Sequence, residues 1–254
     1  MILKRFALLL FGAAAAAALL SCSATLPPSR TGTAPADASA EHASLRAIYS
    51  EMGRAGGRVF TLMPQDSSVR IYAFRAGRAA RLGHNHVLSA PQFTGFFYLP
   101  ASGAGKGRFD LAFRLDQLEI DNPAYRAGLG AAFSSVLSPE DSEGTREHLL
   151  GADGVQADRF PFVRIGSLQI SGEAPKFAAE ARIEMHGQQR DIWIPLDVAG
   201  LPDRLSVSGS FVMRQTDFGV QPFSLLGGLL SVQDEVVVDF KLTGVCRLDA
   251  SSTC

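Results

Sequence analysis

Apolar and polar residues alternate along several stretches of the chain. Residues 108–115 carry an apolar side chain at every second position, and so do residues 176–185, 192–198 and 235–242. Successive side chains of a β-strand point to opposite faces, so this period of two predicts strands with one buried and one solvent-exposed face. Five further stretches are strand candidates: Arg58–Leu62, Val69–Arg75, Phe93–Leu99, Phe162–Ile170 and Leu205–Met213.

Short clusters of turn residues, such as Ser171-Gly172 and His186-Gly187, separate these stretches. Short strands joined by tight turns predict an antiparallel sheet. About eight such strands, each with one apolar face, can close into a barrel or pack as a sandwich. The clear helical stretch lies between Ser138 and Leu150, and Ala43–Met52 could form another short helix. The predicted fold class is all-β, with one short helix.

The N-terminal segment has the character of a signal peptide. Lys4 and Arg5 precede an apolar run from Phe6 to Leu20 that is too short for a permanent transmembrane helix. The run ends in Leu19-Leu20-Ser21-Cys22, which resembles the lipobox of bacterial lipoproteins. We therefore predict that residues 1–21 are removed and that Cys22 carries a lipid anchor. The alternative is a simple signal peptide with a cysteine near its cleavage site.

This interpretation predicts an exported, membrane-anchored lipoprotein that faces the periplasm. Buried acyl chains anchor a protein at about 0.8 kcal/mol per methylene group. Ser23, rather than an aspartate, follows the cysteine. By resemblance to lipoprotein sorting of the enteric type, this favours the outer membrane.

The rest of the chain divides by composition. Residues 22–57 are rich in Ala, Ser, Pro and Gly, which predicts a flexible tether. Residues 58–247 hold all the strand candidates and have the length of one ordinary domain. Residues 248–254 form a C-terminal tail.

The net charge and the cysteine content change the predicted fold and function little. The formal net charge is −1, and it becomes −3 when Lys4 and Arg5 leave with the signal peptide. Since no basic stripe is present, nucleic acid is not an expected partner. Cys246 and Cys254 form an even pair in an exported protein, which predicts a disulfide; two free thiols on a frayed tail are the alternative.

Four stretches resemble, in the same order, motifs of the YceI-like family: Pro64–Ile71, Arg146–Val163, Met185–Leu196 and Arg214–Val220. The second pairs a helix with an Asp, aromatic, Pro strand start. The third is a glycine hairpin with a proline-bearing strand, and the last contains Asp, Phe and Gly in succession. Two places depart from the family pattern, because Met63-Pro64 stands where Asp-Pro is usual and Gly83–Val87 is richer in histidine.

The resemblance implies a lipocalin-like antiparallel barrel that holds a long apolar molecule, such as a polyisoprenoid, an isoprenoid quinone or a fatty amide. A barrel of about eight strands either fills its interior with side chains or encloses one small ligand. Burying a prenyl chain there is favourable by about 25 cal/mol per Å² of apolar surface. The candidate ligand contacts are Phe74, Phe97, Phe113, Ile183, Ile194, Phe211 and Phe240. Trp193 has the opposite parity and belongs to the outside of the barrel or to the lip of the cavity.

The same residues have a simpler interpretation. Phenylalanines on the inner face of a barrel can pack against each other and leave no cavity, because the period of two marks only which face is buried. A structural envelope protein with a filled core is therefore an alternative function.

His84-Asn85-His86 suggests three interpretations. On a strand the two histidines share a face, so both imidazoles could reach one metal ion, with His148 or His186 as a third ligand. Alternatively they form hydrogen bonds to the backbone or to a ligand head group, or they are plain surface residues. We retain His84 and His86 as candidate head-group contacts and keep a metal-dependent envelope protein as an alternative.

The sequence contains no motif typical of hydrolytic enzymes. The chain lacks a Gly-x-Ser-x-Gly elbow and a spare cysteine nucleophile, and its glycine-rich stretches lack the ending of a phosphate loop. We therefore expect a binding protein without enzymatic activity or cofactor. The connection Leu225–Leu230, which contains Gly227-Gly228, is unusually apolar for a loop. It could form a lid, contact a membrane or plug the core.

Overall fold

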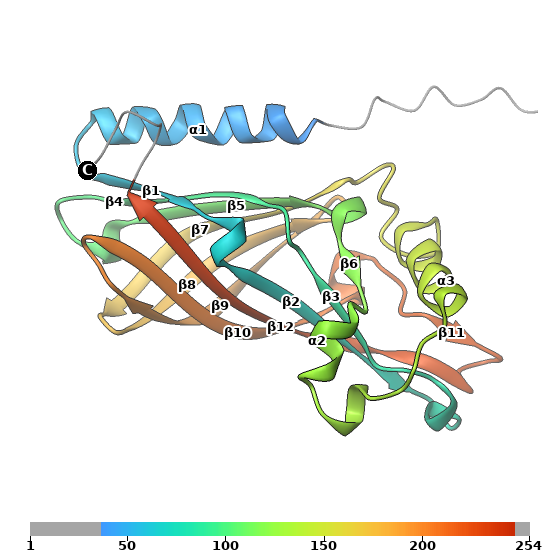
Figure 1. Ribbon diagram of the computed structural model, residues 1–254. Helices are drawn as coiled ribbons and strands as arrows, with labels where there is room; N and C mark the ends of the chain where they lie inside the picture. The colour runs from blue at the N-terminus through green and yellow to red at the C-terminus, as the bar shows by residue number, and fades with distance from the viewer. Residues whose placement is uncertain (1–36, 247–254) are drawn as a thin grey trace, which may run out of the picture. The chain divides into compact units, whose positions relative to one another are not determined.

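Antiparallel pairing closes eight strands of the chain into a barrel. The computed structural model describes residues 37–246. The barrel strands follow the order β1-β4-β5-β7-β8-β9-β10-β12, and β12 pairs back with β1 (Figure 1). Their bounds are β1 Arg58–Leu62, β4 Thr94–Leu99, β5 Arg108–Arg114, β7 Phe162–Glu173, β8 Lys176–Met185, β9 Gln188–Ala199, β10 Arg204–Arg214 and β12 Leu230–Cys246. The predicted barrel is confirmed.

Four further strands extend one side of this barrel: β2 Ser68–Ala76, β3 His86–Ser89, β6 Glu119–Ile120 and β11 Ser224–Leu225. β1 and β2 lie one after the other along the same edge of β12, with Phe60 opposite Cys246 and Val69 opposite Phe240. Between them the chain forms a short 3₁₀ turn at Pro64–Asp66. Proline removes one backbone donor from the ladder, so this interruption is placed where the strand bends.

The burial of the long strands follows the sequence pattern. In β8, Phe177, Ala179, Ala181, Ile183 and Met185 are all buried, and the intervening residues are less so. β9 repeats the alternation from Ile194 to Val198. The strand predictions for these stretches are confirmed, because one face of each strand supplies the core.

Three α-helices lie among the described residues, where the sequence predicted one clear helix: α1 Ala38–Arg54, α2 Pro123–Ala127 and α3 Pro139–Leu150. α3 confirms the predicted helix between residues 138 and 150. It begins with a capping box, in which the Ser138 hydroxyl accepts from the Asp141 N–H and the Asp141 carboxylate accepts from the Ser138 N–H. None of the helices in residues 37–246 is long and apolar enough to cross a bilayer.

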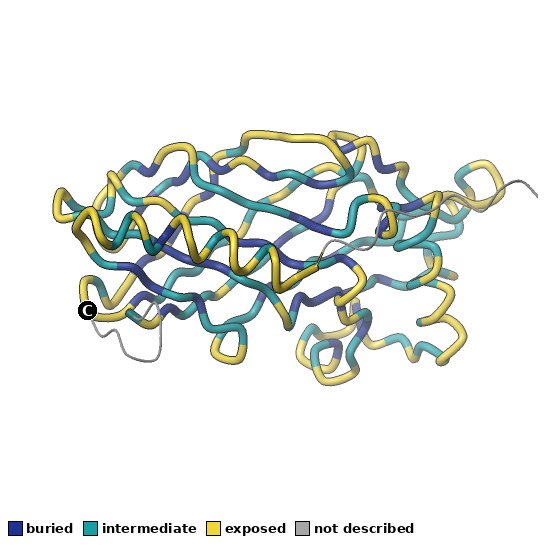
Figure 2. Tube along the Cα trace, turned by 90° about the horizontal axis from the view of Figure 1, so that it is seen from above, coloured by how far each residue is buried: buried dark blue, intermediate teal, exposed yellow. Residues whose placement is uncertain are grey.

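α1 corrects the predicted tether, because residues 38–54 form a helix of 17 residues instead of a flexible chain. It packs on the outside of β1 and β4, and Figure 2 shows exposed residues along its outer side. Leu45, Tyr49 and Met52 recur at helical spacing and cover Val59 and Phe96. The sequence suggested part of this helix at Ala43–Met52. Three apolar residues on one face suffice to hold it when the barrel offers a matching patch.

Tyr49 is the anchor of this helix. Its side chain is completely buried, its ring stacks on Phe96 at 5.2 Å between centroids, and its hydroxyl donates to Asp110 Oδ2 at 2.7 Å. Burial, together with the negative charge of Asp110, raises the pKa of Tyr49 far above its usual range. The hydroxyl therefore stays protonated and remains a donor.

We expect Tyr49→Ala to release α1 from the barrel without unfolding it. Removal of a buried aromatic side chain costs about 3–5 kcal/mol, which exceeds what the remaining contacts of one helix supply. Amide hydrogen exchange should become fast across residues 38–54 and stay slow in β8 and β9. Ile48→Ala, at a neighbouring position that is 39% exposed, is the matched control. Equal exchange in the two variants would show that Tyr49 does not anchor the helix.

The predicted terminal features lie mostly outside the described residues. These include the signal peptide, Cys22 and Cys254. Cys246 is disulfide-bonded. The pairing of Cys246 with Cys254 stays a prediction.

Candidate ligand cavity

The inward faces of the barrel strands enclose a cavity of about 110 Å³. Every residue that lines it is apolar. All eight barrel strands and β2 contribute side chains, and five phenylalanines form much of the wall: Phe97, Phe109, Phe177, Phe211 and Phe240. A cavity without polar groups offers no partner to water, so it is suited to hydrocarbon.

The cavity occupies only one half of the barrel. It reaches Ala104, in the 3₁₀ turn between β4 and β5, and Leu201, in the turn between β9 and β10. The other half is filled by packed core residues such as Met185, Phe218 and Val220. α3 and the loop after it cover that filled end, where Arg146 of α3 donates to the Leu118 carbonyl and Val155 joins the core.

One glycine shapes the wall. Gly209 of β10 lies opposite Phe240 of β12, and a Cβ at this position would stand 2.7 Å from the Phe240 ring. The absent side chain lets the ring lie against the strand. This arrangement leaves the space beside Phe211 and Val207 open as cavity.

The profile of the YceI-like domain family matches residues 60–244, which include nearly the whole barrel. The chain belongs to the YceI-like family. This confirms the resemblance seen in the four sequence stretches. No curated protein matches the chain at a significant level.

Solved structures share the YceI-like fold at low sequence identity. BcnA from Burkholderia cenocepacia is 14% identical with a TM-score of 0.53, and the alignment covers 72% of this chain and 98% of that one. A polyisoprenoid-binding domain from Saccharophagus degradans is 13% identical with a TM-score of 0.49, covering 74% and 98%. The Campylobacter jejuni YceI protein is 10% identical with a TM-score of 0.45, covering 61% and 82%. At these identities the likeness concerns the fold alone.

Four of the predicted contacts line the cavity of this YceI-like barrel: Phe97, Ile194, Phe211 and Phe240. Phe113 and Ile183 point inward as predicted, but they belong to the filled core. Lining residues that the prediction missed include Phe109 and Phe177, both of which lie on apolar faces that the alternation had already marked.

Two predicted contacts lie outside the YceI-like barrel. Trp193 is 52% exposed on the outer face of β9, because its neighbour Ile194 points inward. Phe74 has the opposite parity to Val69 of β2, which lines the cavity, and it packs edge-on against Phe133. Its assignment to the cavity is wrong because Phe74 was placed without regard to its parity in the strand.

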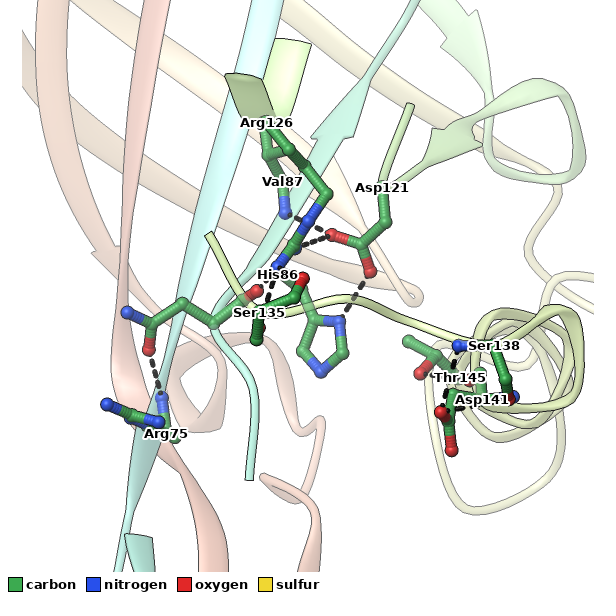
Figure 3. Close-up of polar contacts among 10 residues, drawn as sticks. Arg75, His86, Val87, Asp121, Arg126, Ser135, Ser138, Asp141 and Thr145 are labelled. Atoms are coloured by element: carbon green, nitrogen blue, oxygen red, sulfur yellow. Dashed lines mark hydrogen bonds and ion pairs between the residues drawn. The ribbon is translucent and has the colours of Figure 1, made fainter. Parts of the chain in front are cut away.

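His86, the first residue of β3, belongs to a polar cluster away from the cavity (Figure 3). His86 Nδ1 lies 2.6 Å from Asp121 Oδ2. The other oxygen, Asp121 Oδ1, accepts from the Val87 N–H at 3.0 Å and from Arg126 Nη1 at 2.6 Å. Neither His84 nor His86 is among the residues that line the cavity.

Arg126 completes the cluster from α2. Its guanidinium also donates to the Asn85 carbonyl at 2.7 Å and to Ser135 Oγ at 3.0 Å. Arg126 is 7% exposed and Asp121 is 5% exposed. Sequence reasoning missed both residues, since nothing in the local pattern distinguishes them from surface charges.

The ionisation of Asp121 reflects two opposed effects. Burial disfavours the carboxylate, but hydrogen bonds from His86, Val87 and Arg126, together with the electrostatic interaction with His86, outweigh it. The pKa of Asp121 is therefore below its usual range. The cluster joins β3, β6 and α2, so we interpret it as a structural clasp.

The geometry does not support the metal interpretation. Within residues 37–246, no three His, Cys, Asp or Glu side chains converge closely enough to hold an ion. His186 Nδ1 faces the Phe218 carbonyl at 2.9 Å, and His148 packs against Phe223. Neither supplies the third ligand that the sequence suggested. His84 Nδ1 is buried without a hydrogen-bond partner in the structure.

Proposed function

We propose that this YceI-like protein binds the hydrocarbon part of one lipid inside its barrel and releases it unchanged. The enclosed, wholly apolar cavity is the observation that carries the proposal. Because no polar group lines it, any head group of the ligand stays at the mouth, near the turns that contain Ala104 and Leu201. An isoprenoid, a quinone tail or a fatty amide meets this requirement.

The volume of the cavity limits which ligands it can admit. Pockets that bury a drug-sized molecule usually measure about 300–1,000 Å³, whereas this cavity measures about 110 Å³. A tail therefore enters only if side chains of the wall rotate aside, and the lining phenylalanines are the largest groups able to do so. Each methylene that enters contributes about 0.8 kcal/mol. A long narrow tail buries more methylenes than a compact ligand, so it offsets the free-energy cost of this rearrangement better.

The polyisoprenoid-binding domain from Saccharophagus degradans supports the choice of ligand class only as a relative of similar fold. We further propose that the chain is exported and anchored through lipidated Cys22, with the barrel facing the periplasm at the outer membrane. The sequence motif around Cys22 supports this part of the proposal.

A structural role with a filled core is the competing proposal. The small size of the cavity and the tight packing of the opposite half of the barrel favour it.

One experiment separates these two functions. We expect protein purified from its native host to carry a prenyl or fatty lipid in near-stoichiometric amount, because the apolar cavity retains a tail through purification. Solvent extraction followed by mass spectrometry measures it. Protein unfolded and refolded without lipid is the control for adventitious material. If native protein holds no more lipid than the refolded control, the carrier proposal fails and the structural role stands.

A further inference from the structure

Two loops at the filled end of the barrel expose large apolar side chains to solvent. Leu82, in the connection between β2 and β3, is 69% exposed. In the hairpin between β11 and β12, Leu225, Leu226 and Leu229 are 47%, 82% and 37% exposed. We name residues 77–83 together with residues 225–230 the leucine tip. Figure 1 shows β11 at the same end as α3.

The leucine tip is one surface rather than two separate loops. The Ala79 N–H donates to the Leu229 carbonyl at 2.8 Å. A Cβ on Gly77 would stand 2.5 Å from the Gly228 carbonyl oxygen, and one on Gly83 would stand 2.8 Å from the Leu230 side chain. Phe223, just before the hairpin, packs edge-on against His148 of α3 at 4.6 Å between ring centroids. The tip is therefore held on the barrel and on the helix.

The hairpin turn holds a leucine outward at some cost. Leu226 has a φ of +50°, in the left-handed region, and Gly227 and Gly228 follow with positive φ. A non-glycine residue in this region costs about 1–2 kcal/mol. Burial of the side chain does not offset this cost, since Leu226 is the most exposed of the four leucines.

The leucine tip itself carries two positive charges and no acidic residue. Arg78 and Arg81 are exposed and form no ion pair within residues 37–246. No Asp or Glu occurs between residues 67 and 109 or between residues 218 and 233. Among the acidic side chains near this end, the Asp141 carboxylate accepts from Ser138 and the Asp234 carboxylate accepts from Thr216. Glu140, Glu143 and Glu147 of α3 are exposed.

The tip also lies at the end of the barrel where the described chain begins. Glu41, near the start of α1, forms an ion pair with Arg164 at 2.8 Å, and Asp37 interacts electrostatically with Arg114. Arg114 ends β5, which runs in the same direction as β2, so α1 starts at the end that carries the tip. Residues 23–36 span at most about 50 Å when extended. An anchor at Cys22 would thus keep this end near the bilayer.

We propose that the leucine tip docks on an anionic bilayer, with its leucines in the interfacial region and Arg78 and Arg81 against lipid phosphates. Exposed leucines beside arginines have the composition of interfacial membrane contacts, and each arginine near an anionic surface adds about 1 kcal/mol of attraction. The exposed residues support this contact independently of the cavity and its ligand. The docked barrel would present its cavity end, with Ala104 and Leu201, away from that bilayer.

A tryptophan reporter tests the proposal in the full chain. Trp193 is the only tryptophan, and it lies on the outer wall of the barrel. The tip reporter is Leu226→Trp combined with Trp193→Phe, and Leu82→Trp in the same background is a second reporter. Both are reconstituted, beside the wild type, in phosphatidylcholine vesicles that contain phosphatidylglycerol and lipids brominated on their acyl chains. We expect a blue shift and strong quenching of the tip tryptophan, while Trp193 of the wild type stays unquenched.

Reversing the charge of the two tip arginines is the second part of the experiment. Arg78→Glu with Arg81→Glu, in the reporter background, should abolish most of the quenching, whereas Arg204→Glu at the opposite end should leave it unchanged. The N-terminal segment is present in every variant, so it does not account for a difference between them. If both tip reporters are quenched no more than Trp193, the tip does not contact the bilayer and the proposal is overturned. Quenching that survives the reversal would overturn the role of the two arginines.

Discussion

Replacing Asp121 with Asn is expected to lower the free energy of unfolding by about 3–5 kcal/mol, which is the usual cost of breaking a buried ion pair. The amide has the size of the carboxylate but no charge, so Arg126 would be left buried at 7% exposure without a counter-ion. Asp121 has a φ of +55°, and asparagine tolerates this conformation as well as aspartate does. The substitution therefore isolates the charge from backbone strain.

Urea denaturation measures this loss. Asp191→Asn is the matched control, because Asp191 pairs with Arg182 at the surface, where the side chains are 38% and 46% exposed, and exposed pairs contribute less than about 1 kcal/mol. Similar losses in both variants would mean that the clasp of His86, Asp121 and Arg126 does not stabilise the fold more than an ordinary surface pair.

The pH dependence of the same comparison has a definite sign. The pKa of Asp121 is lowered in the folded protein, whereas an unfolded aspartate titrates near about 3.9. The stabilisation from its ionised form is thus complete above about pH 4–5 and is lost as pH falls through the lowered folded value. The stability difference between the wild type and Asp121→Asn should shrink between about pH 5 and pH 2. A constant difference over this window would contradict the assignment.

Filling the cavity is expected to remove the bound lipid while the barrel stays folded. Val207 of β10 lines the cavity, so Val207→Trp would place an indole in a space of about 110 Å³. Excluding about four methylene groups of a tail forfeits about 3 kcal/mol, or roughly a hundredfold in affinity. The added bulk itself costs about 1–3 kcal/mol of stability, which circular dichroism and a urea titration would detect.

The matched control is a substitution on the outer face of the same strand, β10. Val212 is 58% exposed on the outer face of β10, so Val212→Trp adds the same group outside the barrel. Lipid extracted from each purified variant is quantified by mass spectrometry against the wild type. A Val207→Trp protein that is folded and retains its lipid would show that the ligand lies elsewhere on the molecule.

The two predictions concern the buried ion pair and the cavity wall, and the sequence reveals these two features to different degrees. Alternation is a local property, because each strand residue faces the side opposite to its neighbours whatever the rest of the fold does. It therefore predicted the long strands and the inward position of Phe97, Ile194, Phe211 and Phe240, but it left a barrel and a sandwich both open. It also assigned Trp193 to a parity that the structure confirms as the outer face.

The remaining features depend on segments that meet only after folding. Asp121 and His86 are separated by 35 residues, and Tyr49 and Asp110 by 61, so no local pattern connects them. α1 packs its three apolar residues on the outer face of β1 and β4, a contact that its composition could not reveal. Whether inward phenylalanines fill a barrel or leave a cavity depends on their mutual packing.

By itself, the sequence determined antiparallel strands with one apolar face each, since burial period and turn residues are local, and its resemblance to a known family implied that these strands form a barrel. Only the tertiary structure decided that an apolar cavity remains in the interior, that His86 joins a buried ion pair, and that four leucines gather at one solvent-exposed tip. The physical reason is that side-chain direction follows from the backbone of one strand. Cavities, buried charges and surface patches follow from which strands and loops become neighbours.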